Sequence, residues 1–172
     1  MNLKSLWNRK FALFIEKASF QLMGVIFIFL LFKVTVETVA ISISWLVISE
    51  ILSQVHPRTR TDESVSMFLS GFLLVYLATF PQTFSLHIAL KGLGVFLLSI
   101  GAIRNIWKIS AHVAGISFLA SLASIFGSVF LSAFSFLILP VVTWSRLRLK
   151  RHNTLQVVAG FVFGLVLPVL II

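Results

Sequence analysis

The sequence predicts an all-α membrane protein, a helix bundle of six or seven transmembrane spans that forms one domain over residues 1–172. Hydrophobic residues make up 59% of the chain and charged residues only 11%, and the mean hydropathy is +1.07. Apolar runs of roughly 20 residues, the length that crosses a bilayer, recur between short polar segments. The net charge of +9 is typical here of membrane topology, anionic lipid headgroups and an anionic substrate, so we expect no nucleic-acid partner.

The N-terminal third of the chain predicts one interfacial segment and two spans. Residues 1–17 mix cationic and aromatic side chains, which indicates a short amphipathic helix at the membrane interface with Trp7 at headgroup depth. The two spans are expected over residues 18–32 and 34–53. A polar loop over residues 56–63 follows, where a proline ends the preceding helix.

A basic break at residues 104–108 and a glycine turn at residues 127–128 divide the rest of the chain. Counted from the polar loop, two spans lead to residues 104–110 and two more lead to a basic segment at residues 145–152. These segments are therefore expected on one side of the membrane. The predicted helices are residues 64–80, 83–103, 110–126, 129–144 and 153–172.

The basic segment has two interpretations. It holds four of the fourteen Lys and Arg residues of the chain within residues 146–151, next to His152. Cations that flank a span can serve topology alone. Arg and Lys beside a histidine also make a phosphate site, because Arg clamps phosphoryl oxygens and histidine attacks phosphorus or moves a proton. The basic segment alone leaves both interpretations open.

The spacing within this segment carries a family resemblance. Ser145 and Arg146 are followed after five residues by His152, and Gln156 stands four positions further on. This order is similar to the third motif of the type 2 phosphatidic acid phosphatase (PAP2) family of integral-membrane lipid phosphatases. That motif reads S-R, five residues, H, three residues, D, so an amide here occupies the aspartate position.

Two further motifs extend the resemblance. The sequence Ile-Ser-Ala-His at residues 109–112 stands where the family has P-S-G-H. The first motif, K, six residues, R-P, is only faintly present within residues 56–60. The resemblance covers residues 56–164 and implies a PAP2-like core over that range.

The resemblance implies a role for each matching residue. His152 would be the nucleophile that forms a phosphohistidine, and His112 would be the general acid that protonates the leaving group. Arg146 and Ser110 would bind the phosphoryl oxygens at the N-terminal end of a helix. Arg58 or Arg60 would stand for the arginine of the first motif, and Lys108 or Arg104 would supply its missing lysine charge.

An orienting group is expected beside the nucleophile. Gln156 lies four residues after His152, so on a helix the two side chains share a face. We therefore expect the Gln156 amide to reach one ring nitrogen and leave the other free to attack. An amide fixes a tautomer but does not compensate the charge of an imidazolium as a carboxylate does.

The carboxylates of the chain are few. There are five, too scattered for a cluster of oxygen ligands, so we expect phosphate chemistry without a metal or another cofactor. Asp62 or Glu63 is expected to approach the cations, with a salt bridge to Arg146 or Arg104 as the alternative. Glu16 is expected to be remote from the site.

These observations predict a metal-independent phosphatase that hydrolyses a phosphomonoester or diphosphate of a membrane lipid. The lipid would be an isoprenyl diphosphate, phosphatidate or phosphatidylglycerol phosphate. The alternatives are a catalytically inactive lipid-phosphate binding or carrier protein, and a structural membrane protein whose cations serve topology only. We expect a multi-pass protein of the cell membrane. The positive-inside rule favours a site on the cytoplasmic face, whereas the family resemblance implies the alternative, the periplasmic face that many bacterial members use.

Overall fold

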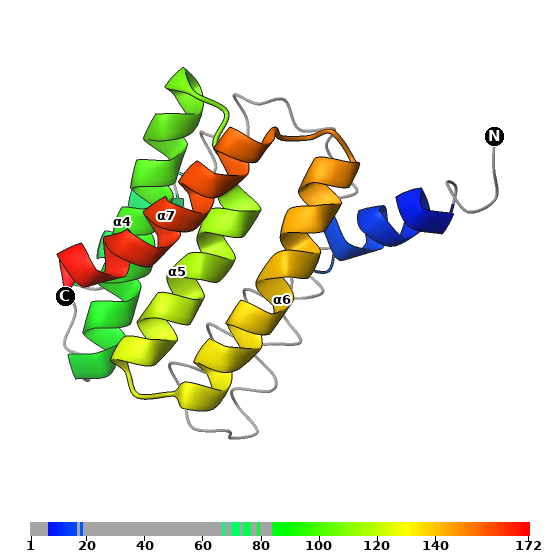
Figure 1. The fold of residues 1–172 in the computed structure, drawn as a ribbon. Coiled ribbons are helices and arrows are strands. Elements are labelled where there is room, and N and C mark those ends of the chain that lie inside the picture. The colour runs from blue at the N-terminus through cyan, green and yellow to red at the C-terminus, as the bar shows by residue number, and fades with distance from the viewer. Residues whose placement is uncertain are drawn as a thin grey trace.

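The computed structural model describes residues 7–16, 18, 67, 70–72, 74–76, 79 and 84–172, which are helical or lie in turns and connecting segments, with no strand among them. The predicted spans at residues 18–32 and 34–53 lie outside the described residues. Residues 7–16 form an N-terminal helix, as predicted. The bundle consists of α4 (Phe84–Ile106), α5 (Ala111–Ile125), α6 (Val129–Arg148) and α7 (Thr154–Ile171) (Figure 1).

Helix termini follow the local signals of the sequence. Ser110 precedes the first turn of α5 in an extended conformation, and Gly127, with a φ of +73°, turns the chain between α5 and α6. Asn153 caps α7 through a capping box with Gln156. These three boundaries lie within one residue of their predicted positions.

Two helices extend further than predicted. The predicted basic break begins at residue 104, but α4 continues to Ile106 and carries Arg104 in its last turn. Similarly, α6 continues past Trp144 to Arg148. Cations in a last turn interact favourably with the negative end of the helix dipole, and neither segment contains a glycine or proline that would end the helix earlier.

Helix α5 is the centre of the bundle. Its residues 113–123 are all buried, because α7 covers one side and α6 another (Figure 1). From α4, Phe96 packs against Phe118 with ring centroids 4.6 Å apart. A serine hydroxyl links each neighbour to α5: Ser121 donates to the Leu165 carbonyl oxygen of α7, and Ser132 of α6 donates to the Ala120 carbonyl oxygen, both at 3.0 Å.

Among the described residues, three helices are long and apolar enough to cross a membrane: His87–Ile106 within α4, Val129–Arg148 and Thr154–Ile171. This is typical of an integral membrane protein. Helix α5 was predicted as a span, but its 15 residues make a helix about 22 Å long, shorter than a bilayer core of about 30 Å. It is an apolar helix buried among the others rather than a span by length.

Glycines allow α7 to approach α5 closely. A Cβ added at Gly160 would lie 2.7 Å from the Ser110 carbonyl oxygen, and one added at Gly164 would overlap the Ala114 carbonyl oxygen. Small residues permit such backbone contact where lipid offers no hydrophobic driving force between helices. The crossing fixes the start of α5 against the first turns of α7.

We expect Gly164→Ala to destabilise the bundle by about 3 kcal/mol or more, because the methyl group would overlap backbone rather than a flexible side chain. Gly92→Ala is the matched control, since a Cβ there would lie 3.7 Å from the Phe118 ring, an ordinary contact. Thermal unfolding in detergent measures both variants. A Gly164→Ala protein that unfolds at the same temperature as Gly92→Ala would contradict the close crossing.

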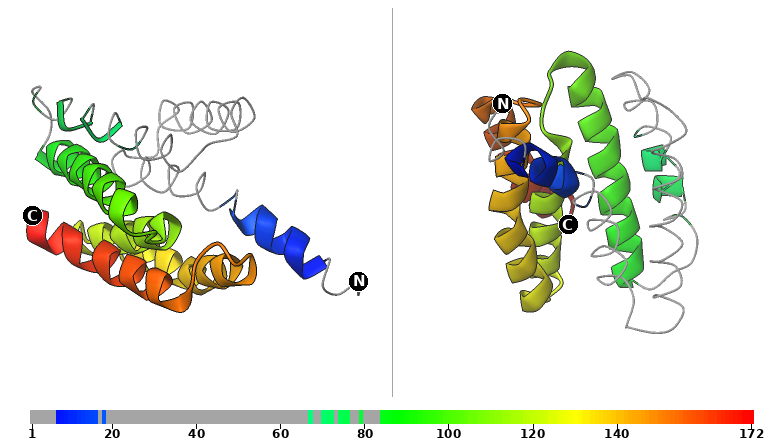
Figure 2. Two further views of the ribbon diagram at one scale, coloured as in Figure 1. Left: turned by 90° about the horizontal axis from the view of Figure 1, so that it is seen from above. Right: turned by 90° about the vertical axis from the view of Figure 1, so that its right-hand side faces the viewer.

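Two of the connections between helices lie at one end of the bundle, opposite the Gly127 turn that joins α5 to α6 (Figure 1). Residues 107–110 join α4 to α5, and residues 149–153 join α6 to α7 at the same end (Figure 1). These two segments therefore share one end of the bundle, and their placement on one side of the membrane stays a prediction. The polar loop at residues 56–63 lies outside the described residues. The N-terminal helix lies against the C-terminal half of α6, where Phe11 and Trp144 have ring centroids 6.1 Å apart (Figure 2).

Candidate phosphate-binding site

Four of the predicted site residues meet at this end of the bundle. Ser110 and His112 begin α5, Arg146 lies in the last turn of α6, and His152 precedes α7. The Ser110 and Arg146 side chains are buried, with relative exposures of 0% and 3%. Arg146 and His152 lie close enough to His112 for their charges to act on its ring. Three helix ends therefore contribute to one polar cluster within an apolar protein.

Ser110 places a hydroxyl inside this cluster. As the residue before α5 it would normally cap the helix, but its side chain makes no capping hydrogen bond, and Oγ has no hydrogen-bond partner among the described residues. Its backbone N–H donates to the Gln156 carbonyl oxygen at 3.2 Å, which joins the start of α5 to α7. A buried hydroxyl at the N-terminal end of a helix is suited to an anionic ligand.

His152 is held by a backbone carbonyl. Its Nδ1 lies 3.2 Å from the Lys108 carbonyl oxygen. A carbonyl oxygen only accepts, so Nδ1 carries the proton and donates it, and Nε2 of the neutral ring keeps its lone pair. The structure therefore presents the Nε2 atom of His152 as the available base or nucleophile.

The surroundings of His152 favour the neutral ring. Burial lowers its pKa below the ordinary value of 6.5, and the charges of Arg146 and Lys108 lower it further. The Lys108 carbonyl, the second largest influence, and the Gln156 side chain act in the opposite direction and raise the pKa. The net shift is downward, so the ring is neutral at pH 7 and loses its attacking lone pair only at lower pH.

We expect the titration midpoint of His152 to lie below 6.5. Because the neutral ring attacks, the reactive fraction rises as the pH rises through this lowered pKa, and the neutral form predominates at pH 7. Histidine-selective NMR in detergent micelles measures the midpoint, and the signal is assigned by its loss in His152→Gln. A midpoint at or above 6.5 would contradict the account of this environment.

Gln156 has a structural role that the sequence did not indicate. Its side-chain oxygen accepts from the Asn153 N–H at 3.2 Å, and its own N–H donates to Asn153 Oδ1 at 2.9 Å. Its side chain also contacts His152, as predicted, and raises the pKa of that ring. The Nδ1 hydrogen bond of His152, however, goes to the Lys108 carbonyl oxygen. The sequence does not indicate this contact, because every residue has a backbone carbonyl.

The other predicted cations fall into two groups. Lys108 is exposed, and its charge acts on His152. Arg104 acts on His112, and its Nη1 lies 3.9 Å from Met67 Sδ. Both therefore flank the histidines. The remaining predicted site residues lie outside the described residues: Arg58, Arg60, Asp62 and Glu63.

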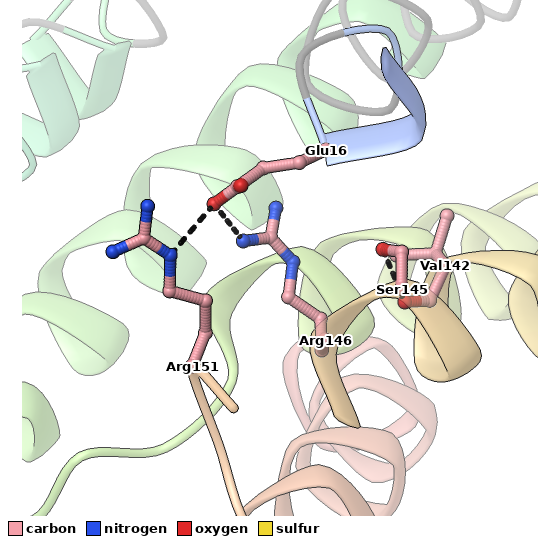
Figure 3. Close-up of polar contacts among 5 residues, drawn as sticks. All are labelled: Glu16, Val142, Ser145, Arg146 and Arg151. Carbon is pink, nitrogen blue, oxygen red and sulfur yellow. Dashed lines mark hydrogen bonds and ion pairs between the residues drawn. The ribbon is translucent and has the colours of Figure 1, made fainter. Parts of the chain in front are cut away.

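The prediction that Glu16 is remote is wrong. Glu16 Oε1 lies 2.5 Å from Arg146 Nη1 and 3.7 Å from Arg151 Nε (Figure 3). The N-terminal helix reaches the site because Ala12 and Ile15 pack inward, on the same face as Glu16. The spacing of these three residues was the available signal, since positions i, i+3 and i+4 share a helix face.

An apolar groove adjoins the site. It has a volume of about 450 Å³ and opens between the end of α4 and the outer face of α7. Trp107 and Ile109 line its end nearest Lys108 and Ser110. The rest of the lining is aliphatic and aromatic: Ile103, Ala159, Val162, Phe163, Val166, Leu167 and Leu170.

Comparison with known proteins adds no family. The chain matches no protein-family model, no curated protein and no solved structure. The chemical interpretation of this end of the bundle therefore rests on its own residues and their geometry.

Proposed function

We propose that this chain is an integral-membrane phosphatase of PAP2 type that removes phosphate from a lipid. One observation carries the proposal: a buried arginine and a buried serine hydroxyl lie with two histidines at the meeting point of three helix ends. A cationic clamp, a hydroxyl donor and a neutral imidazole are the groups that phosphoryl transfer to histidine requires. An arginine that served topology alone would be expected at the exposed membrane surface, whereas Arg146 is buried.

In the proposed reaction, Nε2 of His152 attacks phosphorus and forms an N–P bond while the P–O bond to the lipid breaks. Burial and the charges of Arg146, Arg104 and His152 lower the pKa of His112, so its ring is neutral without a ligand and takes up a proton when the anionic phosphate binds. It gives this proton to the departing oxygen, while Arg146 and Ser110 hold the other phosphoryl oxygens. His112 then takes a proton from water, whose oxygen attacks phosphorus and releases inorganic phosphate from His152. The ring nitrogen regains its lone pair, so the cycle closes without a metal.

The apolar groove supports a lipid rather than a soluble substrate. It begins beside Lys108 and Ser110 and continues along α7, so a hydrocarbon chain lying in it would hold the headgroup at the site. Isoprenyl diphosphate, phosphatidate and phosphatidylglycerol phosphate all fit this description. We propose that the protein lies in the cell membrane with the site facing the cytoplasm. The test is a Thr154→Cys variant treated in intact cells with an impermeant maleimide, and a labelled protein would contradict this orientation.

Phosphate release from these three lipids by the detergent-solubilised protein in EDTA tests the proposal. Turnover in EDTA supports a metal-free lipid phosphatase. Tight binding of a lipid phosphate without turnover would instead indicate a binding or carrier protein. If the protein shows neither binding nor turnover, the cations have a topological role.

A further inference from the structure

The acidic residue that the structure places at the site comes from outside the motifs. Of the five carboxylates of the chain, Glu16 is the one that lies in the described residues. It contacts two of the cations at this end of the bundle, Arg146 at the end of α6 and Arg151 in the following loop (Figure 3). We call these three residues the Glu16 cluster.

The two ion pairs in the Glu16 cluster differ in strength. Arg151 is 57% exposed, and an ion pair of 3.7 Å at that exposure is weak on its own. The Arg146 side chain is 3% exposed and Glu16 22%, so water screens their 2.5 Å contact far less. Removing one partner of a buried pair leaves the other charge uncompensated. Glu16 therefore contributes to the charge balance and orientation of Arg146.

The cluster also reaches the nucleophile. Arg151 directly precedes His152, and the backbone N–H of Arg151 donates to the Arg146 carbonyl oxygen at 3.1 Å. Arg146 in turn acts electrostatically on both His152 and His112. One carboxylate thus contacts both the phosphate-binding arginine and the residue that precedes the attacking histidine.

We propose that Glu16 is a positioning residue of the phosphatase site, which holds Arg146 and the residue 149–153 loop in the arrangement that phosphoryl transfer needs. The inference rests on the proposed function. It assigns the N-terminal helix a part in the site rather than in membrane anchoring alone. The contrary possibility is that the carboxylate occupies the place of the phosphate and blocks it, and the two give opposite results.

Glu16→Gln tests the inference, because it keeps the shape and the acceptor oxygen while removing the charge. We expect kcat to fall by about 10²-fold, the loss typical of a reacting group displaced by about 1 Å. The control is Arg9→Gln, an exposed residue of the same helix, which we expect to leave kcat unchanged. Unchanged turnover in Glu16→Gln, or turnover that rises as a blocking carboxylate requires, would overturn the proposal.

A second measurement separates positioning from general stability. The charges of Arg146 and Lys108 act on the His152 ring, and His152 and His112 interact electrostatically. Arg151 is the residue before His152 in the chain. Loss of the Glu16 charge leaves these cations less compensated, so the NMR titration midpoint of His152 should fall below that of the wild type. A folded Glu16→Gln protein with an unchanged midpoint would count against the cluster.

These measurements also distinguish the two proposals. If the wild type releases no phosphate from any lipid, the proposed function fails, and the His152 midpoint alone then decides the role of Glu16. If Glu16→Gln does not fold, Arg151→Gln replaces it, because that exposed side chain contributes little to stability. We expect Arg151→Gln to lower kcat several-fold with unfolding unchanged, and wild-type kcat in this variant would overturn the link to the loop.

Discussion

Replacing His152 with alanine is expected to lower turnover by about 10⁴-fold or more, because removal of a nucleophile takes away the covalent route entirely. Substrate binding should persist, since Arg146 and Ser110 provide the phosphoryl contacts and the groove contacts are apolar. Turnover and lipid-phosphate binding are measured on the same preparation. Wild-type turnover in His152→Ala would end the assignment of the nucleophile.

The control for this variant is His87→Ala. His87 is an exposed histidine of α4, outside the site, so its removal tests the effect of losing any histidine. We expect its turnover to match the wild type. An equal loss in both variants would indicate damage to the bundle rather than to the chemistry.

His112→Ala is expected to slow the hydrolysis of a lipid phosphate by roughly 10²- to 10⁴-fold, the usual contribution of a general acid. The reason is specific, since an alkoxide leaves slowly without a proton. In a lipid-like substrate with an aryl leaving group, the aryloxide departs without protonation. His112→Ala should therefore hydrolyse this substrate at nearly the wild-type rate. His152→Ala should remain inactive on both substrates.

This contrast between leaving groups defines the two roles. If His112→Ala is equally slow with alkyl and aryl substrates, His112 contributes something other than a proton to the leaving group. If His152→Ala recovers on the aryl substrate, the assigned roles of the two histidines are reversed. Initial rates on both substrates, compared for the two variants, give the answer.

The helix ends that the sequence predicted well are those marked by residues with a local mechanism. Gly127 adopts a positive φ, and Asn153 supplies a side-chain cap, so both signals act within a few residues. The sequence pattern places the ends of α4 and α6 too early, because polar segments begin at Arg104 and Ser145 while the helices continue to Ile106 and Arg148. A cation in a last turn extends a helix rather than ending it.

The candidate site was predictable where helix topology alone determines it. Because α5 and α6 form an antiparallel pair joined by a short turn, Ser110 and Arg146 must lie at the same end of the bundle. The Lys108 carbonyl at His152 Nδ1 was not predictable, since any residue type supplies a carbonyl. The contact between Glu16 and Arg146 joins residues 130 positions apart, and only the packing of the N-terminal helix on α6 produces it.

The central claim is that phosphate passes through His152. Its most direct test is the trapping of label on the protein after brief reaction with a lipid that carries radiolabelled phosphate. We predict a labelled protein whose phosphate is stable in base and lost in acid, as a phosphorus–nitrogen bond requires, and no label in His152→Ala. Lipid hydrolysis by the wild type without trapped label, or label retained in His152→Ala, would contradict the account.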